Sequence, residues 1–151
     1  MAMWNADVTT RLGAGTAARM GGTAAFVFAG LGLLGVVFFG VASLKTGPAV
    51  AGGGLLLVMM KTDAAMAVIG GLTEALIGII AGFRLREGKG LVWGGMAMIL
   101  VVLELIGKVA DSHFGGLVIN IVIAAYLFNG LRGAYALAKG RFAQDEADVS
   151  G

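Results

Sequence analysis

Cysteine is absent from this chain, and proline occurs once, at Pro48. The lack of cysteine excludes disulfide bonds, thiolate metal sites and cysteine nucleophiles. Charge is scarce too, because Asp, Glu, Lys and Arg make up 13% of the residues, against about 25% in a typical soluble domain. The single histidine, His113, cannot supply the several ligands of a usual zinc site. The sequence has no P-loop, GxSxG or HExxH motif, so we expect no catalytic residues, no cofactor and no metal.

Apolar residues and glycine take the place of the missing charge. Hydrophobic residues make up 58% of the chain, and 27 of its 151 residues are glycine. A soluble domain of this length cannot hide so much apolar surface from water, so the composition indicates a lipid bilayer as the solvent. Glycine without proline is typical of membrane helices that pack closely. The net charge of +2 comes from basic residues that flank apolar runs, which indicates membrane orientation and not nucleic-acid binding.

Four apolar runs, each near the roughly 20 residues that cross a bilayer, predict four transmembrane helices. We place them approximately at residues 21–44, 64–83, 91–107 and 117–138 of a single membrane domain, residues 1–151. The first run exceeds the about 7–15 apolar residues of a signal peptide. Continuous runs argue against alternating barrel strands, and short connectors favour an all-α, four-helix transmembrane bundle. Residues 48–61 fit either an interfacial segment or an extension of the second helix.

Basic residues fall unevenly on the two sides of these spans. If the N-terminus is cytoplasmic, eight of the eleven Lys and Arg residues lie in the cytoplasm and three lie opposite. The positive-inside bias of short loops favours this orientation. We therefore predict a multi-pass protein with both termini cytoplasmic. The cytoplasmic set is Arg11, Arg19, Arg84, Arg86, Lys89, Arg132, Lys139 and Arg141.

Two acidic residues lie within the predicted spans. Glu104 precedes Lys108 by one helical turn, the favourable order for an ion pair on one helix, so a local structural role is its simpler interpretation. Glu74 lies about 15 Å of helix before Arg84, near the bilayer middle. No cation lies within one turn of Glu74 on its own helix. An ionised acid at that depth costs about 2.5–3.5 kcal/mol on insertion scales, so we expect Glu74 to face the bundle interior in its protonated form.

Two roles for Glu74 stay open at this point. As a structural clasp, its neutral carboxyl group would hydrogen bond across helices, with Asn120, Thr23, Ser43 or a backbone carbonyl as candidate partners. As a functional site, it would relay a proton or cation with Glu104 as the next station. The two carboxyl groups differ in predicted depth by about 10 Å, too far to share one proton. The clasp is the simpler interpretation.

Glycine pairs predict faces of close helix packing. Gly78 and Gly82 form a GxxxG pair, which opens a groove for the backbone of a neighbouring helix. In the first span we expect Gly30 and Gly35 to line a similar small-residue face.

The fourth span ends in polar and aromatic residues. Asn129 and Arg132 lie on one face near the predicted cytoplasmic surface, where Arg132 can meet lipid phosphate. Three aromatic residues are interface anchors by type: Trp93, Tyr126 and Tyr135. The run NGLRGAYA, which follows the LELIGK segment of the third span, resembles the last helix of small four-span bacterial membrane proteins of uncharacterised function. That resemblance covers the third and fourth spans. It implies a helix bundle in a bacterial inner membrane and implies no activity.

These patterns predict a non-enzymatic accessory or scaffold subunit that packs against other membrane helices. Its expected partners are the lipid bilayer and either other membrane subunits or further copies of itself. The alternative is a small proton- or cation-coupled transporter centred on Glu74. The candidate intramembrane polar residues are Glu74, Glu104, Lys108, Asn120, Asn129 and Arg132.

Overall fold

Four helices make up almost all of the described structure, a computed structural model that describes residues 8–46, 63–110 and 116–140. The helices are α1 (Arg11–Thr46), α3 (Asp63–Arg86), α4 (Leu91–Ala110) and α5 (Leu117–Lys139). Each contains a stretch long and apolar enough to cross a membrane, and no strand occurs in the described ranges. The prediction of an all-α, four-helix transmembrane fold is therefore confirmed. The uncertain segment 48–61 lies outside the described residues.

Helix α1 begins earlier than the sequence predicted. The expected span started at residue 21, whereas the helix starts at Arg11 and runs for 36 residues. It measures about 54 Å at 1.5 Å per residue, well beyond the roughly 30 Å hydrocarbon core of a bilayer. Packing stabilises this extension, because Ala14, Ala17 and Ala18 within it are buried.

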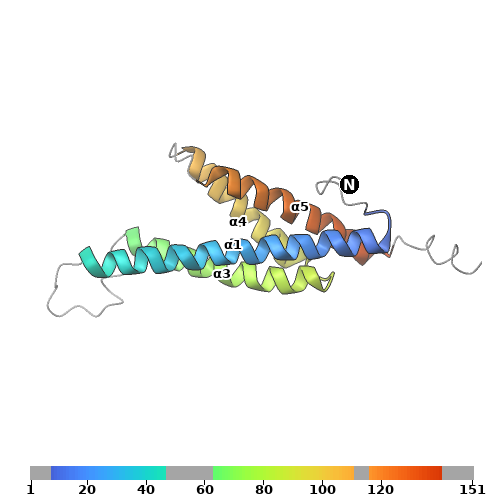
Figure 1. The fold of residues 1–151 in the computed structure, drawn as a ribbon, viewed down its shortest axis with the longest axis horizontal. Helices are drawn as coiled ribbons and strands as arrows, with labels where there is room; N and C mark the ends of the chain where they lie inside the picture. Colours follow the sequence, from blue (N-terminus) through green and yellow to red (C-terminus); the bar gives the residue numbers. More distant parts are fainter. Residues whose placement is uncertain (1–7, 47–62, 111–115, 141–151) are drawn as a thin grey trace, which may run out of the picture.

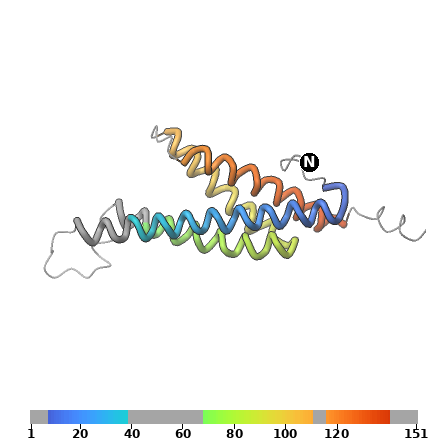
Figure 2. Tube along the Cα trace, in the orientation of Figure 1, coloured from blue at the N-terminus to red at the C-terminus, as the bar shows by residue number. Residues whose placement is uncertain are grey.

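The helices form two pairs that meet at one end and separate toward the other (Figure 1). Helices α1 and α3 run side by side along the long axis, and α4 and α5 form a hairpin that leans away from them (Figures 1 and 2). The pairs touch mainly through α1 with α5 and through α3 with α4. We call the end at the α3–α4 turn the converging end. The diverging half is the opposite half of the bundle (Figure 1). It contains the ends of the four apolar spans at Phe38 of α1, Val68 of α3, Ala110 of α4 and Leu117 of α5.

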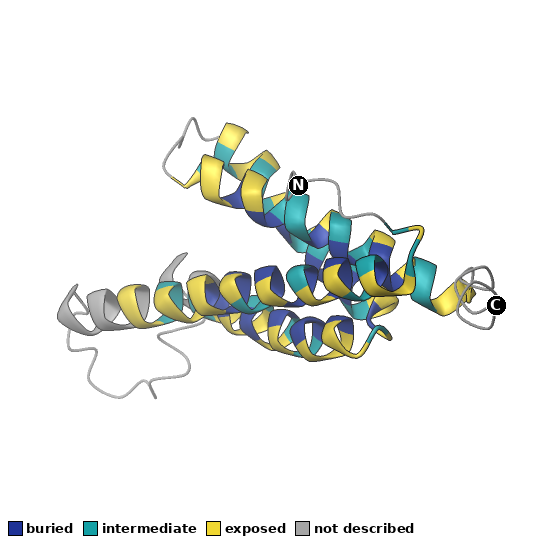
Figure 3. Cartoon of the chain, turned by 45° about the vertical axis from the view of Figure 1, so that its right-hand side comes forward, coloured by how far each residue is buried: buried dark blue, intermediate teal, exposed yellow. Residues whose placement is uncertain are grey.

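The hydrophobic core lies where all four helices meet. Its largest fully buried side chains are Phe28 of α1, Leu85 of α3, Val101 of α4 and Leu127 of α5. In Figure 3 the buried positions gather around this meeting point, while many outer positions are exposed. The exposed positions include many leucine, isoleucine and valine side chains, which a bilayer solvates better than water does.

Glycine brings the backbones of α1 and α5 into direct contact at the converging end. A Cβ added to Gly21 would lie 2.5 Å from the Cα of Gly130, and one added to Gly133 would lie 2.5 Å from the carbonyl oxygen of Ala14. No side chain fits at such distances. Farther along the two helices, Phe28 and Leu127 replace the small residues and fill the core. Small residues at one end and large ones beyond it explain why the helices separate.

Glycine also sets the contact between α1 and α3. The predicted GxxxG pair faces α1, because a Cβ on Gly78 would lie 2.8 Å from the carbonyl oxygen of Ala25 and one on Gly82 would meet the ring of Phe26 at 2.8 Å. Farther along α1, a Cβ on Gly32 would lie 2.9 Å from a backbone carbonyl oxygen of α3. Close backbone approach therefore continues along this side of α1.

The expected small-residue face of the first span needs correction. A Cβ added to Gly30 or Gly35 would meet nothing within 4 Å, so neither glycine packs against a described helix. Among the described glycines of α1, Gly21, Gly22 and Gly32 pack closely against a neighbouring helix. Glycine is so frequent in this chain that spacing alone did not distinguish the packed positions from the open ones.

We predict that Gly78→Leu destabilises the bundle by about 1–3 kcal/mol, the usual range for overpacking a tight contact. The added side chain must push α3 away from Ala25 and Ala29 of α1. Gly30→Leu is the matched control, because it adds the same side chain at a helical glycine with open space around it. Unfolding in a denaturing detergent titration measures both variants. If Gly78→Leu and the wild type had equal unfolding midpoints, the helices α1 and α3 could not be in close backbone contact at Gly78.

Candidate functional site

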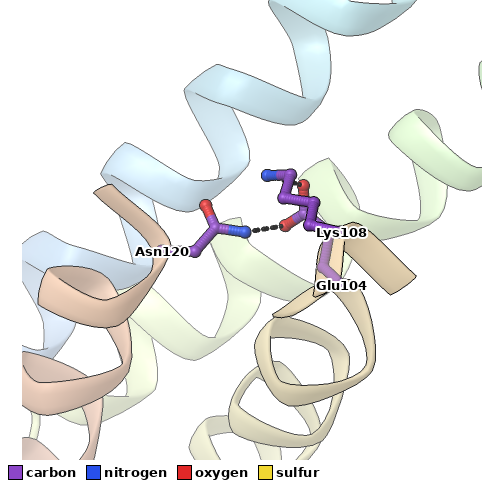
Figure 4. A network of polar contacts seen from close by, with 3 residues as sticks. All are labelled: Glu104, Lys108 and Asn120. Carbon is purple, nitrogen blue, oxygen red and sulfur yellow. Dashed lines mark hydrogen bonds and ion pairs between the residues drawn. The ribbon is translucent and has the colours of Figure 1, made fainter. Parts of the chain in front are cut away.

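A polar cluster of three side chains links α4 and α5 in the diverging half. The Lys108 Nζ donates to Glu104 Oε1 at 2.7 Å, which is the ion pair expected from their spacing. The Asn120 Nδ2 donates to the other carboxylate oxygen, Glu104 Oε2, at 2.8 Å. Figure 4 shows the Asn120 amide reaching Glu104 from the neighbouring helix. Both oxygens of Glu104 are therefore hydrogen bonded, one of them to a cation.

The position of the cluster follows from the helical repeat of α4. Ala97, Val101, Glu104 and Lys108 fall on one face, because their spacings of three and four residues are close to one helical turn. Ala97 and Val101 are fully buried, whereas the side chains of Glu104 and Lys108 are 32% and 24% exposed. The inner face of α4 thus changes from apolar and covered to charged and partly uncovered as the helix pairs separate.

Asn120 is the polar side chain that the described structure buries most deeply. It is 2% exposed and shares a face of α5 with Ile123 and Leu127, two members of the core. An amide buried in this way requires hydrogen-bond partners, and Glu104 provides one. Asn120 was a candidate partner for Glu74, and the structure instead assigns it to Glu104. Across membrane helices such a bond is worth about 0.6–2 kcal/mol.

Glu74 lies on α3, half-buried against α1. A Cβ added to Gly32 of α1 would lie 3.3 Å from the Cβ of Glu74, so this glycine makes room for the acid. No hydrogen bond joins Glu74 to another side chain among those described. Thr23, a second candidate partner, donates to the Arg19 carbonyl oxygen and accepts from Arg86 instead, and the side chain of Ser43 lies outside the described residues.

The other polar candidates do not join this cluster. Asn129 and Arg132 lie on the half of α5 nearer the converging end, where Arg132 is exposed and Asn129 is half-buried. Trp93 and Tyr126, expected as interface anchors, pack against the hydrophobic core. The third expected anchor, Tyr135, is exposed, with the Lys139 Nζ 4.6 Å from its ring centroid.

The cluster has the chemistry of a charge-compensated link between helices. Within the described ranges, no group of three or more His, Asp or Glu side chains gathers to hold a metal ion, and His113 lies outside those ranges. Glu104 is neutralised by Lys108 and oriented by Asn120. The spacing in the sequence indicated the Glu104–Lys108 pair. It carried no signal for Asn120 as the third member, because that contact joins two helices whose relative rotation the sequence does not specify.

No protein-family model, curated protein or solved structure matches this chain. The resemblance of the third and fourth spans to small bacterial four-span proteins therefore stays a prediction. The fold and the polar cluster are the basis for any functional proposal.

We predict that Asn120 and Glu104 are energetically coupled across α4 and α5. A double-mutant cycle with Asn120→Ala and Glu104→Ala should give a coupling free energy of about 0.6–2 kcal/mol, the range for side-chain hydrogen bonds between membrane helices. A second cycle, of Asn120→Ala with Thr73→Ala, is the control, because Thr73 hydrogen bonds to the Ile69 carbonyl oxygen of its own helix. Equal coupling in the two cycles would contradict the described link.

Proposed function

We propose that this chain is a small accessory subunit of a bacterial inner membrane, whose diverging half packs against a transmembrane helix of another subunit. The observation that carries the proposal is the partly exposed Glu104–Lys108 pair on the inner face of α4. Charged side chains within the membrane are costly next to lipid and normally face protein or water. A helix that packs between the two pairs would cover these charges and supply further hydrogen bonds.

Two glycines in the diverging half, Gly35 of α1 and Gly70 of α3, also support this proposal, because each has open space around it. Gly35 shares one face of α1 with Gly21 and Phe28, and Gly70 shares one face of α3 with Glu74 and Ile77. A Cβ at Gly35 or at Gly70 would meet nothing within 4 Å, although each face is packed nearer the core. Small residues allow two membrane helices to approach closely. The diverging half therefore offers both uncovered charge and small residues to an incoming helix.

Basic residues support the proposed orientation, with both termini in the cytoplasm. Arg84 and Arg86 end α3 at the converging end, and Arg19 and Arg132 lie within one turn of the Gly21–Gly130 contact there. The converging end thus carries the cations that the positive-inside rule assigns to the cytoplasm. The cluster of Glu104, Lys108 and Asn120 then lies in the outer half of the membrane.

Reporter fusions test this orientation. We expect cytoplasmic activity for fusions after Gly90 and at the C-terminus, and activity on the opposite side for fusions after Thr46 and after Ala110. A C-terminal fusion that is active outside the cytoplasm would contradict the orientation and the assignment of the cluster to the outer half.

Co-purification tests the accessory role. The full chain, extracted in mild detergent, should carry a second membrane protein at fixed stoichiometry. Gly70→Leu should reduce that recovery about tenfold or more, because it fills the space proposed for the partner helix. The unfolding midpoint of the chain alone should stay unchanged, since nothing lies within 4 Å of that position.

A matched control uses Gly15, which also has open space around it but lies on α1 before the Gly21–Gly130 contact. Gly15→Leu should leave the recovery of the partner unchanged. Purification of the wild type without any stoichiometric partner would contradict the accessory role. If only further copies of the chain are recovered, the transport alternative gains support.

That alternative is a proton- or cation-coupled transporter centred on Glu74. The observation in its favour is that three ionisable side chains lie within apolar helices long enough to cross a membrane: Glu74 on α3, and the paired Glu104 and Lys108 on α4. Intramembrane ionisable groups line proton pathways in transporters.

Proton flux separates the two functions. In proteoliposomes with an entrapped pH dye, the transport alternative predicts flux for the wild type that Glu74→Gln abolishes while assembly is retained. The accessory role predicts the same low flux for wild type and Glu74→Gln. The glutamine keeps the shape of the side chain but cannot ionise. If Glu74→Gln abolishes the flux while assembly is unchanged, the transport function would be favoured over the accessory role.

A further inference from the structure

A groove of about 360 Å³ lies between α1 and α5, apart from the polar cluster. Helix α1 contributes Met20, Thr23, Ala24 and Val27 to its lining, and α5 contributes Val122, Ile123 and Tyr126. All of these residues belong to membrane-spanning segments. The volume falls in the range of about 300–1,000 Å³ that is usual for small-molecule sites. Because the lining is almost entirely apolar, it suits a hydrocarbon chain.

A cation is held at the rim of this groove. The Arg86 Nη2 donates to Thr23 Oγ1 at 3.2 Å, and the Arg86 guanidinium lies over the Phe26 ring at 5.0 Å from its centroid. These contacts join the end of α3 to α1. A guanidinium has five N–H donors, and no carboxylate pairs with Arg86 among the described residues. Arg86 is exposed, so donors are left for an anion.

A second arginine, Arg19, precedes Thr23 by one turn on α1. The Thr23 hydroxyl donates to the carbonyl oxygen of Arg19 at 3.1 Å, one turn earlier on α1, and the Arg19 side chain is exposed. Arg19 and Thr23 share a helix face, because they are one turn apart. The groove therefore has an apolar interior and two arginines at the end where α3 finishes and the membrane interface is expected.

We propose that this groove binds an anionic phospholipid, with one acyl chain between α1 and α5 and the phosphate held by Arg86 and Arg19. Charge complementarity selects this occupant: the interior matches the acyl chain, and the guanidinium fork matches phosphate oxygens. Tyr126 adds an aromatic wall to the apolar interior of the groove. The site is independent of the proposed partner helix, because it lies between α1 and α5, begins beside the Gly21–Gly130 contact, and uses none of the residues of the polar cluster.

Native mass spectrometry of the delipidated full chain tests the site. We expect dioleoylphosphatidylglycerol to bind more tightly than dioleoylphosphatidylcholine. Arg86→Gln should weaken phosphatidylglycerol binding about fivefold, because one basic residue near a membrane surface contributes about 1 kcal/mol. Arg84→Gln is the matched control, since Arg84 is also an exposed arginine in the last turn of α3 but, unlike Arg86, has no hydrogen bond to a groove residue among those described. It should leave the affinity unchanged.

A second pair of variants tests the acyl chain. Val27→Trp should abolish the preferential binding by filling the groove, and its exposed position makes it compatible with folding. Leu33→Trp, at an exposed position of the same helix outside the groove, should bind phosphatidylglycerol as the wild type does. Equal losses for Arg86→Gln and Arg84→Gln would overturn the proposal, as would full binding by Val27→Trp. Neither result would bear on the partner helix, which the Gly70→Leu experiment addresses.

Discussion

The contact between the glycine backbones of α1 and α5 determines how the rest of the bundle is arranged. Gly21 and Gly130 leave no room for side chains between the two helices, whereas Phe28 and Leu127 occupy the core just beyond them. A pair of helices that touches at one end and is held apart beyond it must diverge. The α4–α5 hairpin therefore leans away from α1 and α3 (Figure 1), and the inner faces of the helices lose their neighbours toward the far end.

Both proposed interactions are consequences of this divergence. On the inner face of α4, Glu104 and Lys108 continue the line of buried residues but are only partly covered, and this is the surface that the proposed partner helix would shield from lipid. On the side of the α1–α5 contact, the same separation leaves an apolar groove with Arg86 at its rim. One packing constraint thus produces a polar surface suited to protein and an apolar groove suited to lipid.

The number and class of the helices could be predicted from the sequence because long uncharged runs have few alternatives in a membrane protein. The start of α1 at Arg11 could not be predicted from the apolar run, since Arg11 and Arg19 limit that run but not the helix. The i,i+4 spacing predicted the Glu104–Lys108 pair, while the Asn120 contact depends on how α5 is rotated against α4. Glycine spacing was least informative: Gly78 and Gly82 pack closely, and Gly30 and Gly35 do not. With 27 glycines in the chain, only the tertiary arrangement decides which of them meet.

A distance between spin labels on α1 and α5 tests the divergence most directly. The chain has no native cysteine, so Gly35→Cys, on the α1 face of Gly21 and Phe28, and Ile119→Cys, on the α5 face of Ile123 and Gly130, would give one defined pair of facing labels in lipid nanodiscs. If α1 and α5 diverge, the labels lie well beyond the about 8–10 Å that separates the axes of packed helices. Strong dipolar broadening, which shows that the labels are in close contact, would mean that α1 and α5 pack along their whole length and would contradict the account.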